Sequence, residues 1–200
     1  MLQGSLRPPM TRLITPLSRV LLRIGVTANS ITVLGALGTI AASLLLFTTG
    51  HLFAGTMTIT FFVLTDLLDG TLARMSPQGS STWGALLDST LDRVGDAAIL
   101  GSLIYWLMKS HDHLVGVAFV ALVAGSLISY IKARAESLDI ECNGGIAERT
   151  ERLIILLVAT GFAGLGVSYV LTIGIWLLTV LSLVTVAQRL AIVYRATSGA

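Results

Sequence analysis

The sequence is short of charge. Only 12% of its 200 residues are Asp, Glu, Lys or Arg, against about 25% in a typical soluble domain. Hydrophobic residues make up 54%, so the few charged side chains could not cover a water-soluble globule. The composition predicts an integral membrane protein and argues against a disordered chain. We expect no nucleic-acid partner, because the net charge is only +2.

Cysteine is also scarce. A single residue, Cys142, excludes an internal disulfide and a metal cluster built on cysteine. No secretory signal peptide is expected, because the first 29 residues contain four arginines and no uninterrupted apolar core.

Long apolar runs are what the sequence has instead. A membrane-spanning helix needs about 20 mostly apolar residues, and six such runs are present. The sequence therefore predicts an all-α integral membrane protein with six transmembrane helices. The expected spans are residues 30–49, 53–74, 84–108, 113–135, 150–168 and 170–192.

The basic residues predict the orientation of these spans. With the N-terminus in the cytoplasm, Lys109 is the one residue among 13 Lys and Arg that falls outside. We therefore expect a multi-pass protein of the cell membrane with both termini and the loops 75–83 and 136–149 on the cytoplasmic side. Short outer turns are expected at 50–51, 110–112 and 166–167.

Residues 9–25 precede the first span and have an amphipathic pattern. Arg12, Arg19 and Arg23 share one helical face, and apolar residues fill much of the rest. This pattern predicts a helix in the cytoplasmic interface that is attracted to anionic lipids, and the alternative is a plain basic stop signal. The expected domains are a tail with a juxtamembrane helix (1–29), a six-helix membrane domain (30–195) and a C-terminal tail (196–200).

Four aspartates form the most informative pattern. Asp66 and Asp69 are three residues apart, and Asp88 and Asp92 are four apart, so each pair lies on one helical face. Carboxylates within spans are costly and functional by default. Divalent cations would relieve their repulsion, and oxygen ligands favour Mg²⁺, Mn²⁺ or Ca²⁺. A polar helix contact or a proton relay is the alternative.

These residues carry a family resemblance. The pattern D-x-x-D-G-x-x-A-R over 66–74, followed by G-x-x-x-D-x-x-x-D over 84–92, resembles the signature of the CDP-alcohol phosphatidyltransferases. The resemblance implies metal ligation by Asp66, Asp69, Asp88 and Asp92, with Asp92 also acting as the general base. It further implies a six-span fold, a cytosol-facing site, a CDP-linked lipid donor, CMP release and a homodimer. We expect two Mg²⁺ ions, with Mn²⁺ as an alternative.

Nucleotide-side residues follow from the same resemblance. Residues 29–32 match the family's P-N-x-x-T element, with Ala28 in place of proline. An ordinary helix N-cap by Asn29 or Ser30 is the other interpretation. The expected residues for binding CDP-diacylglycerol are Asn29, Ser30, Ile31, Thr32, Gly70, Arg74 and Ser81.

A second polar group is basic. Ser129 and Lys132 share a face, as do Arg149 and Arg152, and Arg189 lies in the last span. These residues suit an anion pocket, although cations that only anchor helices to head groups would look similar. For Arg134 and Arg195 we favour anchoring.

The surrounding strings, 128–136 and 144–152, resemble the actinobacterial phosphatidylinositol-phosphate synthases, a subgroup of the family. The resemblance implies inositol 1-phosphate as acceptor, with its phosphate on Ser129, Lys132, Arg152 and Arg189 and with Arg149 nearby. The residues themselves indicate only an anionic acceptor, so glycerol 3-phosphate, the acceptor of a phosphatidylglycerophosphate synthase, stays open.

Two further classes compete with an enzyme. A cation-coupled transporter could use the aspartates as its path, but its site should lie near the midplane of the bilayer, and these charges cluster at one face. A non-catalytic scaffold would have no need of four costly carboxylates.

Overall fold

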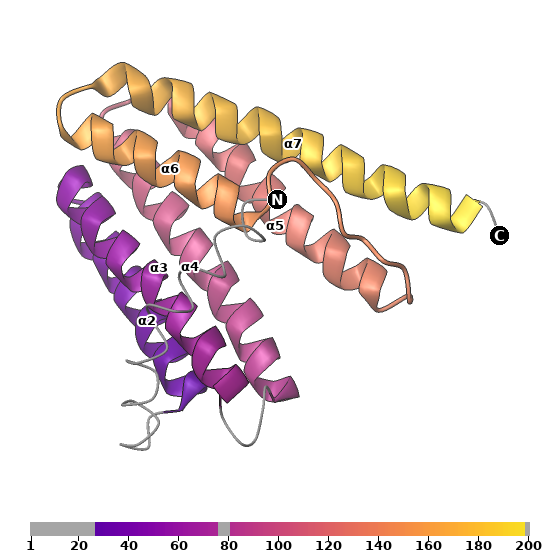
Figure 1. Ribbon diagram of the computed structural model, residues 1–200. Helices are drawn as coiled ribbons and strands as arrows, with labels where there is room; N and C mark the ends of the chain where they lie inside the picture. Colours follow the sequence, from indigo (N-terminus) through magenta and orange to yellow (C-terminus); the bar gives the residue numbers. More distant parts are fainter. Residues whose placement is uncertain (1–26, 76–80, 199–200) are drawn as a thin grey trace. The chain divides into compact units, whose positions relative to one another are not determined.

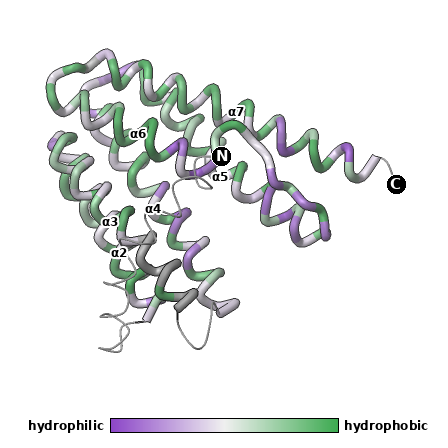
Figure 2. Tube along the Cα trace, in the orientation of Figure 1, coloured by the Kyte–Doolittle hydropathy of each residue, from purple (hydrophilic) through white to green (hydrophobic). Residues whose placement is uncertain are grey.

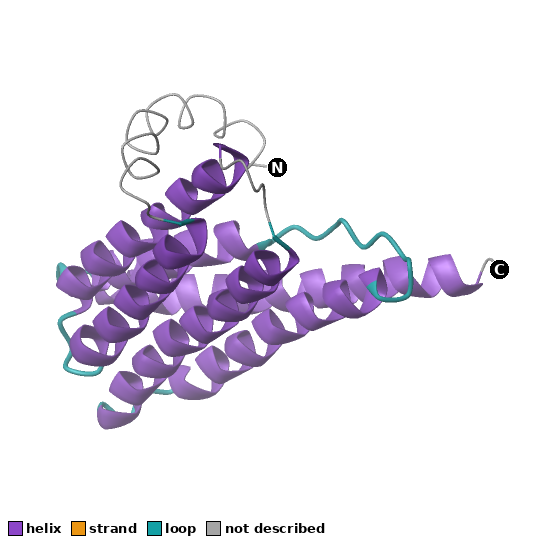
Figure 3. Cartoon of the chain, turned by 90° about the horizontal axis from the view of Figure 1, so that it is seen from below, coloured by secondary structure: helices purple, strands orange, loops and turns teal. Residues whose placement is uncertain are grey.

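The computed structural model describes residues 27–75 and 81–198, with side chains described except at 66–71, 73–75 and 168 (Figure 1). The amphipathic helix expected at 9–25 lies outside the described residues. Within the two described ranges the regular elements are all helical (Figure 3). This confirms the all-α class.

The helices coincide closely with the six apolar runs. Their bounds are α2 (Ala28–Ala42), continued by the π-helical turn η1 (Ser43–Phe47), α3 (Leu52–Met75), α4 (Thr82–Lys109), α5 (Leu114–Glu136), α6 (Arg149–Gly164) and α7 (Ser168–Ser198). Two ends differ from the expected ranges. Helix α6 ends at Gly164 rather than 168, and α7 continues to Ser198, through residues assigned to the last span and into the expected tail.

Three tight turns lie where the sequence predicts short connections. Gly50, His111 and Gly166 have positive φ angles of 82°, 51° and 96°. Glycine adopts this left-handed backbone readily because it has no Cβ. The early end of α6 follows from this geometry, since the chain already turns through Leu165 and Gly166 before α7 begins.

The chain forms two compact units, Met1–Ile99 and Leu100–Ala200, with the boundary inside α4. In the first unit, α2 packs antiparallel against α3. A Cβ placed on Gly35 would lie 2.7 Å from Thr65 Oγ1, and a Cβ on Gly38 would collide with the Phe62 ring. These glycines therefore let the two helices approach closely.

In the second unit, α7 packs on both α5 and α6. Helix α5 runs parallel to α7, because Thr179 Oγ1 donates to Val117 O (3.1 Å) and Arg189, ten residues on, donates to Ile128 O. Helix α6 runs antiparallel, because Gly174 packs on Ala159 and Thr185 contacts Ala147. The C-terminal halves of α5 and α7 therefore meet the start of α6.

This arrangement gathers charge at one end of the second unit. Apart from Lys109, at the end of α4, its Lys and Arg residues lie in the C-terminal parts of α5 and α7 or at the start of α6. Hydrophilic residues continue into the part of the α5–α6 loop that follows the end of α5 (Figure 2). These residues lie at one end of the unit because α5 and α7 run parallel to each other and α6 runs antiparallel to both.

The described helices have the surface of a membrane protein. Ala28–Phe47, Leu114–Glu136 and Tyr169–Ser198 are long and apolar enough to cross a bilayer, and Leu52–Thr65 is a shorter apolar segment. Large apolar side chains face outward, among them Leu34 at 69% exposure and Phe61 at 64%. Apolar exposure on this scale is typical of a surface that contacts lipid or protein rather than water.

Candidate active site

The four aspartates of the family pattern lie in the first unit. The backbone of Asp66 and Asp69 belongs to the C-terminal part of α3, and their side chains, with those of Arg74 and its neighbours, lie outside the described part of the chain. Asp88 and Asp92 lie on α4 and are partly exposed. Among the residues with described side chains, no three acidic, His or Cys groups gather around a metal position, and that set contains only two of the four expected ligands.

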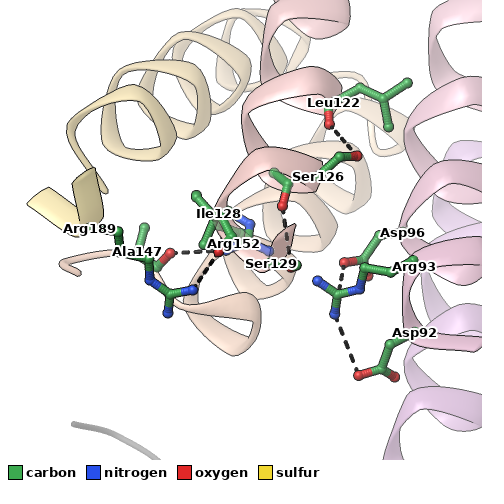
Figure 4. Close-up of polar contacts among 11 residues, drawn as sticks. Asp92, Arg93, Asp96, Leu122, Ser126, Ile128, Ser129, Ala147, Arg152 and Arg189 are labelled. Carbon is green, nitrogen blue, oxygen red and sulfur yellow. Dashed lines mark hydrogen bonds and ion pairs between the residues drawn. The ribbon is translucent and has the colours of Figure 1, made fainter. Parts of the chain in front are cut away.

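Asp92 forms part of a short ion-pair series on α4. Arg93 Nη2 lies 3.6 Å from Asp92 Oδ2 and 3.8 Å from Asp96 Oδ2 (Figure 4). Asp96 follows Asp92 by the same four residues that separate Asp92 from Asp88, so it continues the acidic face. Sequence reasoning did not single out Asp96, although this spacing could have identified it.

Two expected nucleotide residues converge on the start of α4. A Cβ built on Gly84 would lie 2.8 Å from Asn29 Oδ1 and 3.0 Å from Ser81 Oγ. Gly84, Asp88 and Asp92 are spaced by four residues and so share one face of α4. The Asn29 amide is therefore placed at the N-terminal end of the face that carries the two aspartates.

The N-cap of α2 corrects one interpretation. Thr27, rather than Asn29 or Ser30, caps this helix, with Thr27 Oγ1 accepting the Ser30 N–H at 3.2 Å. Helix α2 begins at Ala28, so residues 29–32 form its first turn. Because the capping position is already filled, the Asn29 side chain can lie against Gly84. Ser81 is itself a cap, accepting the Gly84 N–H at 2.9 Å.

Arg189 is the most deeply buried of the expected acceptor residues. It is only 4% exposed, and its guanidinium donates from Nη1 to Ile128 O (2.6 Å) and from Nε to Gly144 O (2.9 Å). These bonds tie α7 to α5 and to the loop before α6. A guanidinium has five N–H donors in a fixed fork, so two backbone bonds leave it capacity for an anion.

Arg152 and Ser129 meet the same part of α5. Arg152 is 7% exposed and donates from Nη1 to Ala147 O at 3.0 Å (Figure 4). Its Nε would lie 3.7 Å from a Cβ on Gly125, whose carbonyl accepts the Ser129 hydroxyl at 3.4 Å. Arg152, Ser129 and Arg189 are thus brought together around residues 125–129.

The remaining basic candidates are more open. Lys132 pairs with Glu136 one turn along α5, at 3.8 Å, and Arg149 is the partly buried first residue of α6. Arg134 is exposed and donates to Ser137 Oγ at 3.3 Å. Its position and that of exposed Arg195 fit the anchoring role expected for both.

Sequence reasoning assigned no role to two polar residues of α7. Thr185 and Gln188 accept backbone N–H groups of the loop before α6. A threonine and a glutamine on an apolar span give little signal by themselves. Their proximity to Arg189 in the sequence is the one feature that could have drawn attention to them.

Comparison with known proteins decides the family. The sequence model of the CDP-alcohol phosphatidyltransferases matches residues 25–184. The chain belongs to this family. Phosphatidylinositol phosphate synthase of Streptomyces avermitilis is 43% identical over 100% of this chain and 85% of its own length. The enzyme of that name from Mycobacterium tuberculosis H37Rv is 42% identical over 94% of this chain and 88% of its own.

Solved structures agree with this assignment. The crystal structure of the M. tuberculosis synthase with CDP-DAG bound superposes with a TM-score of 0.87 at 42% identity, covering 92% of this chain and 94% of that one. A second structure of that synthase, in complex with manganese and citrate, gives a TM-score of 0.85 over 90% of this chain and 88% of that one. The protein is thus a CDP-alcohol phosphatidyltransferase, which decides against a transporter or a scaffold.

Proposed function

We propose that this phosphatidyltransferase uses CDP-diacylglycerol and inositol 1-phosphate to form phosphatidylinositol phosphate and CMP. The observation that best supports this proposal is the basic group around residues 125–129, where buried Arg152 and Arg189 lie with Ser129. An acceptor that bears its own phosphate needs such cations, because planar guanidinium groups bind phosphate oxygens by paired hydrogen bonds. Relatives at about 40% identity carry the name of this activity.

The four aspartates are proposed to hold two divalent ions, Mg²⁺ or Mn²⁺. Asp88 and Asp92 supply oxygen ligands from one face of α4, and the donor set contains neither sulfur nor imidazole, as hard cations prefer. The M. tuberculosis synthase crystallised in complex with manganese, which is a metal of this class. When bound, such ions would neutralise charge on the pyrophosphate of the donor lipid.

The nucleotide end of the donor lipid is assigned to the start of α4 and the first turn of α2. Asn29 and Ser81 lie together at Gly84, and the backbone N–H groups of a helix N-terminus attract phosphate. With Gly70 and Arg74 of α3, residues 29–32 and Ser81 complete the expected nucleotide site.

Asp92 is proposed as the general base. It would take the proton from the attacking hydroxyl of inositol 1-phosphate as the new oxygen–phosphorus bond forms. The phosphorus–oxygen bond to CMP breaks, and CMP leaves with the electron pair of that bond. No covalent intermediate with the protein is required.

A matched pair of variants tests this role. Asp92→Asn should lower CMP release by at least about a hundredfold, since a positioned base contributes roughly 10²–10⁴ in rate. Asp96→Asn is the control, because Asp96 shares the Arg93 partner but lies one turn further along α4. We expect it to retain most of the activity. Equal losses in both variants would contradict the base assignment.

The expected topology completes the proposal. Six spans, cytoplasmic termini and a cytoplasmic site agree with the gathering of basic residues at one end of the second unit. In a Cys142→Ser background, an impermeant thiol reagent on intact cells should label Ser110→Cys and leave Ser137→Cys unlabelled. The reverse pattern would invert the orientation. The homodimer is proposed from the family resemblance, and the mass of the detergent-solubilised protein by light scattering tests it.

A further inference from the structure

The segment before α6, residues 144–147, lies along α7 and is held there by hydrogen bonds of its backbone. Ile146 N–H donates to Gln188 Oε1 at 3.1 Å, and Ala147 N–H donates to Thr185 Oγ1, also at 3.1 Å. One residue earlier in this segment, Gly145 has φ +127°, and a Cβ placed there would collide with Thr185. The close contact therefore depends on glycine at 145.

Thr185 is enclosed and fully engaged. It is 0% exposed, and its hydroxyl donates to Leu181 O at 2.8 Å while accepting from Ala147 N–H. A hydroxyl has one proton and accepts through its lone pairs, so both directions of hydrogen bonding are used. Thr185 consequently fixes Ala147 in one position against α7.

The next contacts connect this segment to the basic residues. Arg152 donates to Ala147 O, and Arg189 donates to Gly144 O. Ala147 is thus held by its N–H to Thr185 and by its carbonyl to Arg152. The position of the Arg152 guanidinium accordingly depends on where α7 holds the segment.

We infer that Thr185 and Gln188 are positioning residues for the acceptor phosphate: they hold residues 146–147 on α7 and thereby fix the guanidinium of Arg152. This inference rests on the proposed function, which places the acceptor phosphate near Arg152. Neither side chain is charged, so their contribution comes from pre-organising the site rather than from attracting the anion.

Isosteric variants remove these bonds with little change in volume. Thr185→Val loses the hydroxyl, Gln188→Met loses the amide oxygen, and Thr185→Ser keeps the hydroxyl as the conservative variant. Thr179→Val is the matched control. Thr179 is also buried on α7, at 4% exposure, but its hydroxyl donates to Val117 O and Ile175 O rather than accepting from the segment.

Kinetic constants for acceptor and donor separate positioning from general damage. In Thr185→Val and Gln188→Met, we expect KM for inositol 1-phosphate to rise roughly five- to tenfold, the effect of one lost hydrogen bond. KM for CDP-diacylglycerol and kcat should stay within about twofold. Thr185→Ser should restore the acceptor KM, and Thr179→Val should leave the ratio of the two KM values unchanged.

Amide hydrogen exchange of the detergent-solubilised protein gives a readout that is independent of activity. Ile146 N–H should exchange faster in Gln188→Met, and Ala147 N–H faster in Thr185→Val. Equal changes in both KM values, an acceptor effect in Thr179→Val as large as that in Thr185→Val, or unchanged exchange at both amides would overturn the inference. If the wild-type protein prefers glycerol 3-phosphate, the proposed acceptor fails, and the same KM comparison with glycerol 3-phosphate decides the positioning role.

Discussion

The two units hold their polar residues in opposite ways. In the second unit, Arg189 reaches backbone carbonyls 45 and 61 residues away in the sequence and is almost completely buried. In the first unit, Asp92 pairs with Arg93, the next residue on its own helix, and its side chain is 20% exposed. Two arginines are thus built into the packing of one unit, whereas Asp88 and Asp92 lie on a partly exposed helix face in the other.

This difference matches the chemistry proposed for each group. A phosphate is recognised by donors whose directions are fixed in advance, and backbone carbonyls fix the guanidinium groups without cancelling their charge. Carboxylates that bind metal must keep their oxygens accessible, because ion pairs that fully occupied them would compete with the ion. Substitutions in the two units should consequently change different measured quantities.

The largest effect outside the aspartates is expected at Arg189. Arg189→Met leaves the buried carbonyl of Ile128 and the partly buried carbonyl of Gly144 without this donor. We expect about 3 kcal/mol of lost stability, since hydrogen bonds to charged groups are each worth roughly 1.5–3 kcal/mol. Thermal unfolding in detergent measures the loss, and acceptor turnover should fall with it. Arg195→Met, on the exposed end of the same helix, should change neither quantity. Unchanged unfolding of Arg189→Met would mean that the unit does not depend on this residue.

The contact at Gly84 should give a smaller, donor-specific effect. In Gly84→Ala the new methyl would displace the Asn29 side chain, so we expect KM for CDP-diacylglycerol to rise roughly tenfold, equivalent to about 1.4 kcal/mol. The acceptor KM should be unaffected. Gly101→Ala is the control on the same helix, since no atom lies within 4 Å of the added Cβ. A donor KM as low as that of Gly101→Ala would remove Asn29 from the nucleotide site.

The smallest effect is expected at Lys132. Its ion pair with Glu136 is partly exposed, and such pairs contribute about 0–1 kcal/mol, so Lys132→Met should leave thermal unfolding unchanged. The acceptor KM should still rise about three- to fivefold if Lys132 helps to attract the phosphate. Arg134→Met provides the comparison with an exposed cation assigned to anchoring. Identical acceptor KM values in these two variants would assign Lys132 to anchoring as well.

Much of the fold could be predicted because membrane helices are encoded locally. Apolar runs located the helices within a few residues, and glycines marked two of the three tight turns. The π-helical turn at Ser43–Phe47 could not be predicted, because no local pattern in the sequence marks it. Phe47, at its end, is fully buried and lies against Gly55 of α3. The Thr27 cap was missed because three polar residues near one helix start offered competing caps.

More of the candidate site could be predicted in the first unit than in the second. The spacing of Asp88 and Asp92 on one face needs only helical geometry. The bonds of Arg189 to Ile128 and Gly144 depend on how α5, α7 and the intervening loop pack, and no local pattern encodes that arrangement. For the same reason, no local pattern indicates a role for Thr185 and Gln188, whose contacts with Ala147 and Ile146 join residues 38 and 42 positions apart.

The central claim is that inositol 1-phosphate is the acceptor. Purified protein with Mg²⁺ and CDP-diacylglycerol should be given inositol 1-phosphate labelled with ³²P, together with an equal concentration of unlabelled glycerol 3-phosphate as competitor. We predict that ³²P enters the lipid fraction in step with CMP release. CMP release without ³²P in the lipid would show that another alcohol is the acceptor and would contradict the account.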